Sequence, residues 1–137
     1  MDAAATTRKQ VVLYPAPGLG HLVSMAELSK ILAAHGLAVT IVIIKPSYDT
    51  DATGPFLADV TAVNPSISFH CLPRVELMPV DSVHPEAVTF EAARTSSSQL
   101  RDFLDGASPA ILVVDFFCSV AVDVATELSI PAYCFFT

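Results

Sequence analysis

The stretch VVLYPAPGLGHLVSM, from Val11 to Met25, leads from an apolar segment through two glycines into a segment with helical spacing of its apolar residues. Four further apolar runs are continuous rather than alternating, which is typical of parallel strands covered on both faces. Helical patterns separate these runs, so βαβ units and a doubly wound parallel sheet of order 3-2-1-4-5 are expected. The expected strands are Val11–Pro15, Leu37–Lys45, Ile67–Leu72, Ala110–Phe116 and Ala132–Phe136, and the expected helices are His21–Gly36, Pro55–Asn64, Pro85–Gly106 and Ser119–Ser129.

The 137 residues suffice for one domain with its own core. We expect residues 1–8 to form a flexible N-terminus and residues 9–137 an incomplete Rossmann-like domain. The last expected strand has no helix after it, which indicates a truncated piece of a larger protein. The proline-rich stretch Pro73–Pro85 is expected to be a long surface loop near a ligand.

Composition excludes several classes of protein. The net charge is −7 and the seven Lys and Arg residues are scattered, so no basic surface for nucleic acid is expected. No apolar run reaches membrane-spanning length, and the N-terminus lacks the features of a signal or transit peptide. Cys71, Cys118 and Cys134 show no paired spacing and are expected to be buried small hydrophobic residues in a reducing compartment. The sequence therefore predicts a cytoplasmic location.

The glycine turn departs from the known nucleotide-binding patterns. In Gly18-Leu19-Gly20-His21 the third glycine of a dinucleotide fingerprint is missing, and no carboxylate stands at the end of the second expected strand to bind a ribose. No Gly-Lys-Ser/Thr follows, which excludes a P-loop. A nucleotide-dependent oxidoreductase is therefore a poor match to the sequence.

The turn does place His21 in the first turn of a helix. The positive end of the helix dipole disfavours an imidazolium there, so we expect a neutral ring that accepts a proton as a general base does. The glycines are expected to let a substrate approach the ring without side chains in the way.

A partner for His21 follows from the expected strand order, which makes the first and fourth strands neighbours. Asp115 lies near the carboxyl end of the fourth strand after four apolar residues, and a carboxylate in such surroundings needs a partner. Topology makes His21 the candidate. The alternative is that Asp115 only caps the following helix.

Other polar residues suggest no further site. The histidines His35, His70 and His84 have no metal-ligand spacing with one another, so no metal site is expected. Asp123 and Glu127 are spaced i,i+4 and are expected to lie on a solvated helix face.

These features together resemble a known family. The start VVLYPAPGLGHLVSMAELSKIL and the later ILVVDFFCSVAVDVATELSIPAYCFFT resemble the N-terminal acceptor-binding domain of plant UDP-dependent glycosyltransferases of family 1, which have the GT-B fold. The resemblance extends from Lys9 to Thr137. It implies that His21 removes the proton from an acceptor hydroxyl and that Asp115 holds this histidine.

The resemblance also implies the substrates. The acceptor oxygen would attack the anomeric carbon of a UDP-sugar, with glucose the expected sugar, to give inversion and a β-glycoside. The UDP-sugar is a co-substrate, and no cofactor is implied. Residues matching positions that border a pocket for a flat phenolic such as a flavonoid are Gly18, Leu19, Phe116 and Phe117, and Thr137 matches a position near the donor sugar.

Two departures qualify this match. Many relatives have proline where this chain has Ser24, which resembles a subgroup with flavonoid and anthocyanidin acceptors. The second domain, which binds most of the UDP-sugar, is missing, so the fragment is expected to be inactive by itself. The alternative function is a non-catalytic module that binds a small molecule or a partner subunit.

Overall fold

The structure is a computed structural model that describes residues 9–45, 54–74 and 85–136, and for 85–88 only the backbone. Helices follow strands along most of the chain. The elements are β1 (Gln10–Tyr14), α2 (Leu19–Ala34), β2 (Ala38–Ile43), α3 (Gly54–Val63), β3 (Ile67–Cys71), α4 (Pro85–Thr95), α5 (Ser97–Ala107), β4 (Ile111–Asp115), the 3-10 turn η1 (Phe116–Cys118), α6 (Ala121–Glu127) and β5 (Ala132–Phe135).

The five strands form one parallel sheet of order β3-β2-β1-β4-β5. This confirms the expected doubly wound α/β fold, with the chain reversing its direction across the sheet between β1 and β4. Leu13 pairs with Val113 and Tyr14 with Val114, so β1 and β4 end side by side. The carboxyl ends of these two strands are the place where such folds bind ligands.

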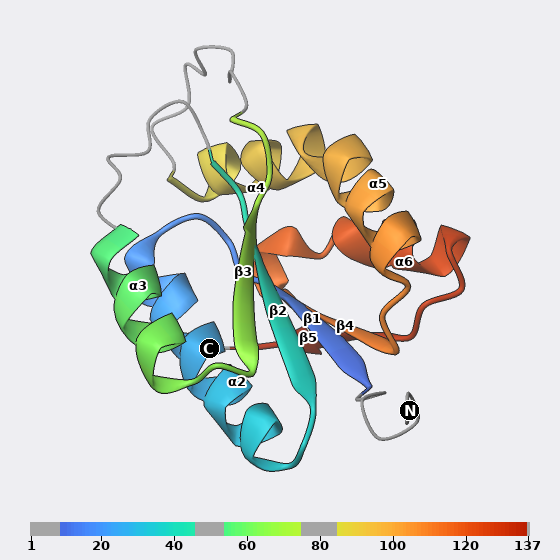
Figure 1. Cartoon of the computed structure of the whole chain (residues 1–137). Coiled ribbons are helices and arrows are strands. Elements are labelled where there is room, and N and C mark those ends of the chain that lie inside the picture. Colours follow the sequence, from blue (N-terminus) through green and yellow to red (C-terminus); the bar gives the residue numbers. More distant parts are fainter. Residues whose placement is uncertain (1–8, 46–53, 75–84, 137) are drawn as a thin grey trace.

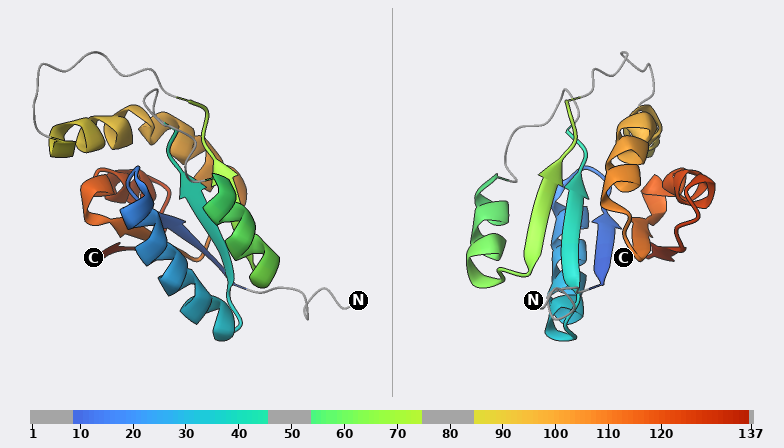
Figure 2. Two further views of the ribbon diagram at one scale, coloured as in Figure 1. Left: turned by 90° about the vertical axis from the view of Figure 1, so that its left-hand side faces the viewer. Right: turned by 45° about the vertical axis from the view of Figure 1, so that its right-hand side comes forward.

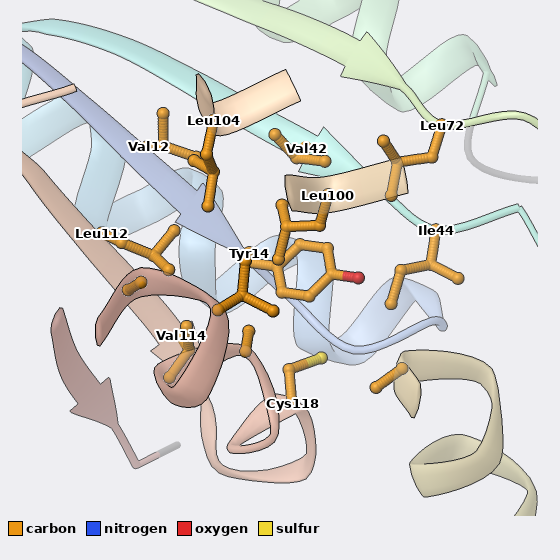
Figure 3. Close-up of a cluster of buried hydrophobic side chains, with 14 of the residues drawn as sticks. Val12, Tyr14, Val42, Ile44, Leu72, Leu100, Leu104, Leu112, Val114 and Cys118 are labelled. Carbon is orange, nitrogen blue, oxygen red and sulfur yellow. The ribbon is translucent and has the colours of Figure 1, made fainter. Parts of the chain in front are cut away.

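Helices cover both faces of the sheet. In Figures 1 and 2, α2 and α3 lie on one face, and α4, α5 and α6 lie on the other. Leu13, Met25 and Ile41 belong to the core beneath α2 and α3. On the opposite face, Figure 3 shows the phenol ring of Tyr14 among side chains that include Leu100. In β1, β2 and β4 the side chains therefore point alternately into one of two cores, which explains the continuous apolar runs in these central strands.

The segment expected to form one helix over Pro85–Gly106 forms two. The backbone N–H of Ser96 still donates to Ala92 at 3.1 Å, and its carbonyl accepts from Leu100 at 2.9 Å, but Ser96 itself lies outside both helices with φ −85° and ψ −1°. Three consecutive serines begin here, and serine favours helix ends because its hydroxyl competes for backbone groups. The break lets both helices turn apolar residues into the same core.

The continuous apolar runs predicted that all five strands are covered on both faces, and this prediction was wrong for the edge strands β3 and β5. In β3 only Ile67 is buried, and in β5 Tyr133 is 60% exposed. For this reason the expectation for the cysteines is also only partly correct. Cys118 is buried, whereas Cys71 on β3 and Cys134 on β5 are exposed.

Two helix boundaries also differ from expectation. Helix α2 begins at Leu19, two residues before His21, and the helix expected over Ser119–Ser129 is the shorter α6, which is preceded by the turn η1. Residues 1–8, Thr137 and most of the expected loop Pro73–Pro85 lie outside the described residues. In the described part of the chain, no helix combines the length and apolar character needed to cross a bilayer.

Candidate functional site

The turn after β1 is shaped by Gly18. This residue has φ +121°, a conformation that side chains rarely adopt, and its carbonyl accepts the N–H of Leu22 at 3.1 Å as α2 begins. A Cβ added at Gly18 would lie 3.6 Å from Cδ2 of His21. A Cβ at Gly20 would meet nothing within 4 Å. Both positions leave room for a Cβ, so it is the positive φ of Gly18, and not lack of space, that requires a glycine in this turn.

His21 and Asp115 form the hydrogen bond that the topology predicted. Nδ1 of His21 lies 3.0 Å from Oδ2 of Asp115, across 94 residues of sequence. The carboxylate is 2% exposed and the imidazole 30% exposed. When Nδ1–H donates to the carboxylate, a neutral ring carries its lone pair on Nε2.

The second oxygen of Asp115 has a separate partner. Oδ1 accepts the backbone N–H of Phe117 at 2.9 Å, which makes Asp115 the N-cap of η1. Asp115 therefore caps the next element and also binds His21, so the alternative that it acts only as a cap is wrong. A buried carboxylate that accepts a hydrogen bond on each oxygen has part of its desolvation compensated.

Four phenylalanines form a group beside His21, which we call the aromatic patch: Phe90, Phe116, Phe117 and Phe136. The ring of Phe117 lies 5.3 Å from the imidazole, centroid to centroid, at an edge-to-face angle of 78°. The other three rings are 40%, 46% and 71% exposed for Phe90, Phe116 and Phe136 respectively. The patch therefore presents apolar ring surface next to a histidine.

The sequence predicted two of the four phenylalanines of the aromatic patch. Phe116 and Phe117 were predicted from the resemblance, whereas Phe90 and Phe136 were missed. Phe90 comes from α4, and its ring lies 5.4 Å from that of Phe117. No sequence signal marked this contact, because it depends on how the crossover from β3 to β4 packs. Phe136 directly follows β5, and its place beside β4 did follow from the expected strand order.

The remaining predicted site residues divide into two groups. Gly18 lies in the turn before α2, and Leu19 is the first residue of α2 and 45% exposed. Thr137 lies outside the described residues. The structure therefore brings together His21, Asp115, the turn and the two predicted phenylalanines at the carboxyl ends of the central strands β1 and β4.

Two buried ionisable groups lie beneath the site. Burial, together with the neighbouring Cys118, raises the pKa of the Tyr14 hydroxyl, while Ser96 opposes this shift. Burial and the charge of Asp115 raise the pKa of the Cys118 thiol. The hydroxyls of Tyr14 and Ser96 are both buried and influence each other, but their geometry falls short of a hydrogen bond, and neither has a hydrogen-bond partner among the described residues. Both Tyr14 and Cys118 are therefore uncharged at neutral pH and act as packing groups.

Other polar residues stand apart from this site. Asp123 and Glu127 are exposed, as expected for a solvated face, and Glu127 forms an ion pair with Arg101 that links α6 to α5. The ring of His70 stacks on Phe103 with centroids 4.3 Å apart. Among the residues that the structure describes, no three His, Cys, Asp or Glu side chains are grouped as metal ligands.

The fold and the site define a class of protein: an open, doubly wound sheet with a histidine–carboxylate pair where its direction reverses. No family model matches the chain. It is 36% identical to UDP-glycosyltransferase 1 of Pueraria montana var. lobata over 95% of its own length and 31% of that protein. It is 33% identical to an anthocyanidin 5,3-O-glucosyltransferase of a Rosa hybrid cultivar, over 93% of the chain and 30% of the relative.

Solved structures agree with the sequence comparison. UGT71G1 of Medicago truncatula, complexed with UDP-glucose, has a TM-score of 0.86 and 30% identity over 94% of this chain and 29% of that one. UGT2 of Phytolacca americana, complexed with UDP-2fluoro-glucose and pterostilbene, has a TM-score of 0.84 and 27% identity over 95% of this chain and 31% of that one. The chain belongs to the plant UDP-glycosyltransferases of family 1, and it spans about 30% of the length of the relatives it matches.

Proposed function

We propose that this chain supplies the acceptor side of an inverting glycosyltransferase, in which a sugar passes from a UDP-sugar to a hydroxyl of a small phenolic acceptor. The observation that carries the proposal is the hydrogen bond between Nδ1 of His21 and the buried carboxylate of Asp115. This bond selects the tautomer whose lone pair is on Nε2, the form that a general base needs.

The reaction follows from this arrangement. Nε2 of His21 removes the proton of the acceptor hydroxyl, and Asp115 stabilises the imidazolium that forms. The acceptor oxygen then forms a bond to the anomeric carbon as the bond from that carbon to the UDP oxygen breaks. UDP leaves with the electron pair, and attack from the opposite side inverts the anomeric centre, so an α-linked donor gives a β-glycoside.

The aromatic patch and the turn suit a planar acceptor. We propose that Gly18, Leu19, Phe116 and Phe117 border the acceptor next to His21; Leu19 and Phe116 are exposed and Phe117 is half-buried. Aromatic rings bind flat apolar surfaces by stacking and edge contacts. The names of relatives support this substrate class, because they include an anthocyanidin glucosyltransferase and phloretin 2'-O-glucosyltransferases. We therefore propose a flavonoid or similar phenolic, with glucose as the sugar.

Donor binding is proposed to need a further domain. The chain corresponds to about 30% of the relatives, and its glycine turn lacks the features of a phosphate-binding loop. Thr137 is the one residue that we propose to lie near the donor sugar. We propose that the 137 residues alone do not catalyse transfer, that no metal or organic cofactor is needed, and that the protein acts in the cytoplasm.

The test compares the chain alone with the chain fused, after Thr137, to the remaining C-terminal part of the Pueraria relative. Each is incubated with UDP-glucose and a panel of flavonoids, and glucosides are measured by chromatography and mass spectrometry. We expect product from the fusion only, and loss of at least ~100-fold in rate for His21→Ala, as expected when a general base is removed.

Two outcomes would contradict the proposal. A fusion that binds UDP but keeps its rate in His21→Ala has another base. A fusion that folds and binds UDP and flavonoid without any turnover supports the alternative of a binding module. Binding of a flavonoid to the 137-residue chain alone can be measured by the quenching of the flavonoid's fluorescence. This measurement shows whether the acceptor site is folded in the absence of the rest of the enzyme.

A further inference from the structure

We propose that Phe117 is a positioning residue for the His21–Asp115 pair, in addition to bordering the acceptor space. It acts through two groups, the backbone N–H on the carboxylate and the side-chain ring on the imidazole. The inference rests on the proposed function in one respect, that His21 is the group whose orientation matters.

The backbone N–H fixes the carboxylate. Free rotation about χ2 of an aspartate is broad and roughly two-fold, so a carboxylate with one partner is poorly oriented. In this structure Oδ1 of Asp115 accepts from the N–H of Phe117 at 2.9 Å, while Oδ2 lies 3.0 Å from Nδ1 of His21. Because the carboxylate is planar, holding Oδ1 also sets the direction in which Oδ2 faces the imidazole.

The ring of Phe117 limits rotation of the imidazole. Histidine χ2 is also broad and two-fold, and a half-turn would exchange the positions of Nδ1 and Cδ2. A half-turn leaves the ring plane unchanged, so the edge-to-face contact of Phe117 with His21, at 5.3 Å and 78°, favours one plane of the imidazole. Within that plane, the bond from Nδ1 to Oδ2 of Asp115 at 3.0 Å selects one of the two flipped orientations. The ring of Phe117 and the carboxylate of Asp115 therefore hold the imidazole together.

Phe117 is itself anchored. Its ring is packed against the buried core beneath α4, α5 and α6, and it contacts Phe90 of α4 at 5.4 Å. The neighbouring Phe116 differs, since it is 46% exposed and its ring contacts are with phenylalanines. Phe116 and Phe117 therefore offer a matched pair on the same turn, one touching the imidazole and the other not.

The experiment measures the tautomer of His21 in the 137-residue chain without substrate. Nitrogen-15 chemical shifts of the imidazole, recorded above the pH at which the ring loses its charge, report which nitrogen carries the hydrogen. In the unmodified chain we expect hydrogen on Nδ1. Phe117→Leu should lower the ratio of the Nδ1–H to the Nε2–H form about 2-fold to 10-fold, the range that loss of one aromatic pair gives.

Controls separate positioning from general damage. Phe117→Tyr keeps the ring and should keep the ratio, and Phe116→Leu should leave it unchanged. If Phe117→Leu does not fold, as judged by its backbone amide spectrum, Phe117→Met tests the same loss with a flexible side chain of similar size. The amide hydrogen of Phe117 should exchange slowly, and this protection should be lost in Asp115→Ala.

The inference is overturned if the ring-deleting variants keep the tautomer ratio, if Phe117→Tyr loses it, or if Phe116→Leu changes it equally. Fast exchange of the Phe117 amide in the unmodified chain would overturn the backbone half. None of these readouts needs turnover. If Phe117→Leu shifts the tautomer ratio but His21→Ala leaves the activity of the fused enzyme unchanged, the proposed function is refuted and the positioning role of Phe117 stands.

Discussion

Replacing Asp115 by asparagine changes one oxygen into an NH₂ group and leaves the size of the side chain almost unchanged. The structure gives the amide two orientations. In one, its oxygen accepts the N–H of Phe117 at the observed 2.9 Å, and its NH₂ faces Nδ1 of His21 at the observed 3.0 Å. In the other orientation the amide oxygen faces Nδ1 of His21, and the NH₂ group faces the backbone N–H of Phe117, so the N-cap hydrogen bond is lost and two donors oppose each other.

The first orientation should dominate. Losing a cap costs about 1 kcal/mol, which is roughly a 5-fold preference, and opposing two donors adds to it. Nδ1 of His21 must then accept a hydrogen bond, so the ring takes the tautomer with hydrogen on Nε2. That nitrogen no longer has a lone pair for the acceptor hydroxyl. A wrong tautomer in a histidine–carboxylate pair costs on the order of 10⁴ in kcat in the serine proteases.

We therefore expect Asp115→Asn to lower kcat of the fused enzyme by about 10²–10⁴, which is roughly 2.7–5.5 kcal/mol of transition-state stabilisation. Initial rates of glucoside formation at saturating UDP-glucose measure this effect. Urea denaturation of the 137-residue variant is the control, and its midpoint should move little because the cap remains. A variant with more than a tenth of the original kcat would refute the argument that Asp115 sets the tautomer.

Four further predictions concern the core and the thiols. Cys71 and Cys134 are exposed and should react quickly with a disulfide reagent at pH 8, whereas Cys118 should react only on unfolding. Since burial raises the pKa of Cys118, stability should be complete below the unfolded thiol pKa near ~8.5 and fall by up to about 1.4 kcal/mol per pH unit above it, measured by urea titration. Tyr14→Phe removes a buried hydroxyl without a described partner and should raise the free energy of unfolding by about 1 kcal/mol, whereas a loss of that size would reveal a bound partner. Leu104→Ala should lower the free energy of unfolding by roughly 2–5 kcal/mol, because Leu104 is fully buried, and a loss under ~1 kcal/mol would contradict its place in the core.

The sheet order and the histidine–carboxylate bond were predictable because both follow from strong local signals. Continuous apolar runs marked the strands, and the right-handed crossover rule left few orders in which to arrange them. Once β1 and β4 were neighbours, the turn that follows β1 and the carboxyl end of β4 had to lie side by side. His21 in the first turn of α2 and Asp115 at the end of β4 are the polar residues at these two places, and their contact needed no knowledge of side-chain packing.

What could not be predicted depends on packing between distant surfaces. The break at Ser96 reflects how α4 and α5 both reach one core, and local propensity across Pro85–Gly106 indicated only a helix. The exposure of the edge strands was missed because their apolar composition resembles that of the central strands, and only the sheet order assigns them to the edges.

The distance of 94 residues between His21 and Asp115 has a consequence for folding. Their bond forms only when the crossover from β3 has returned the chain to the far side of β1, so it is among the contacts of highest sequence separation in the molecule. Contacts of this kind form late, because closing the long loop between the two residues costs conformational entropy before the contact adds any stabilising energy. The imidazole hydrogen of His21 is therefore a reporter of sheet completion, whose appearance in refolding marks the moment when β4 joins β1.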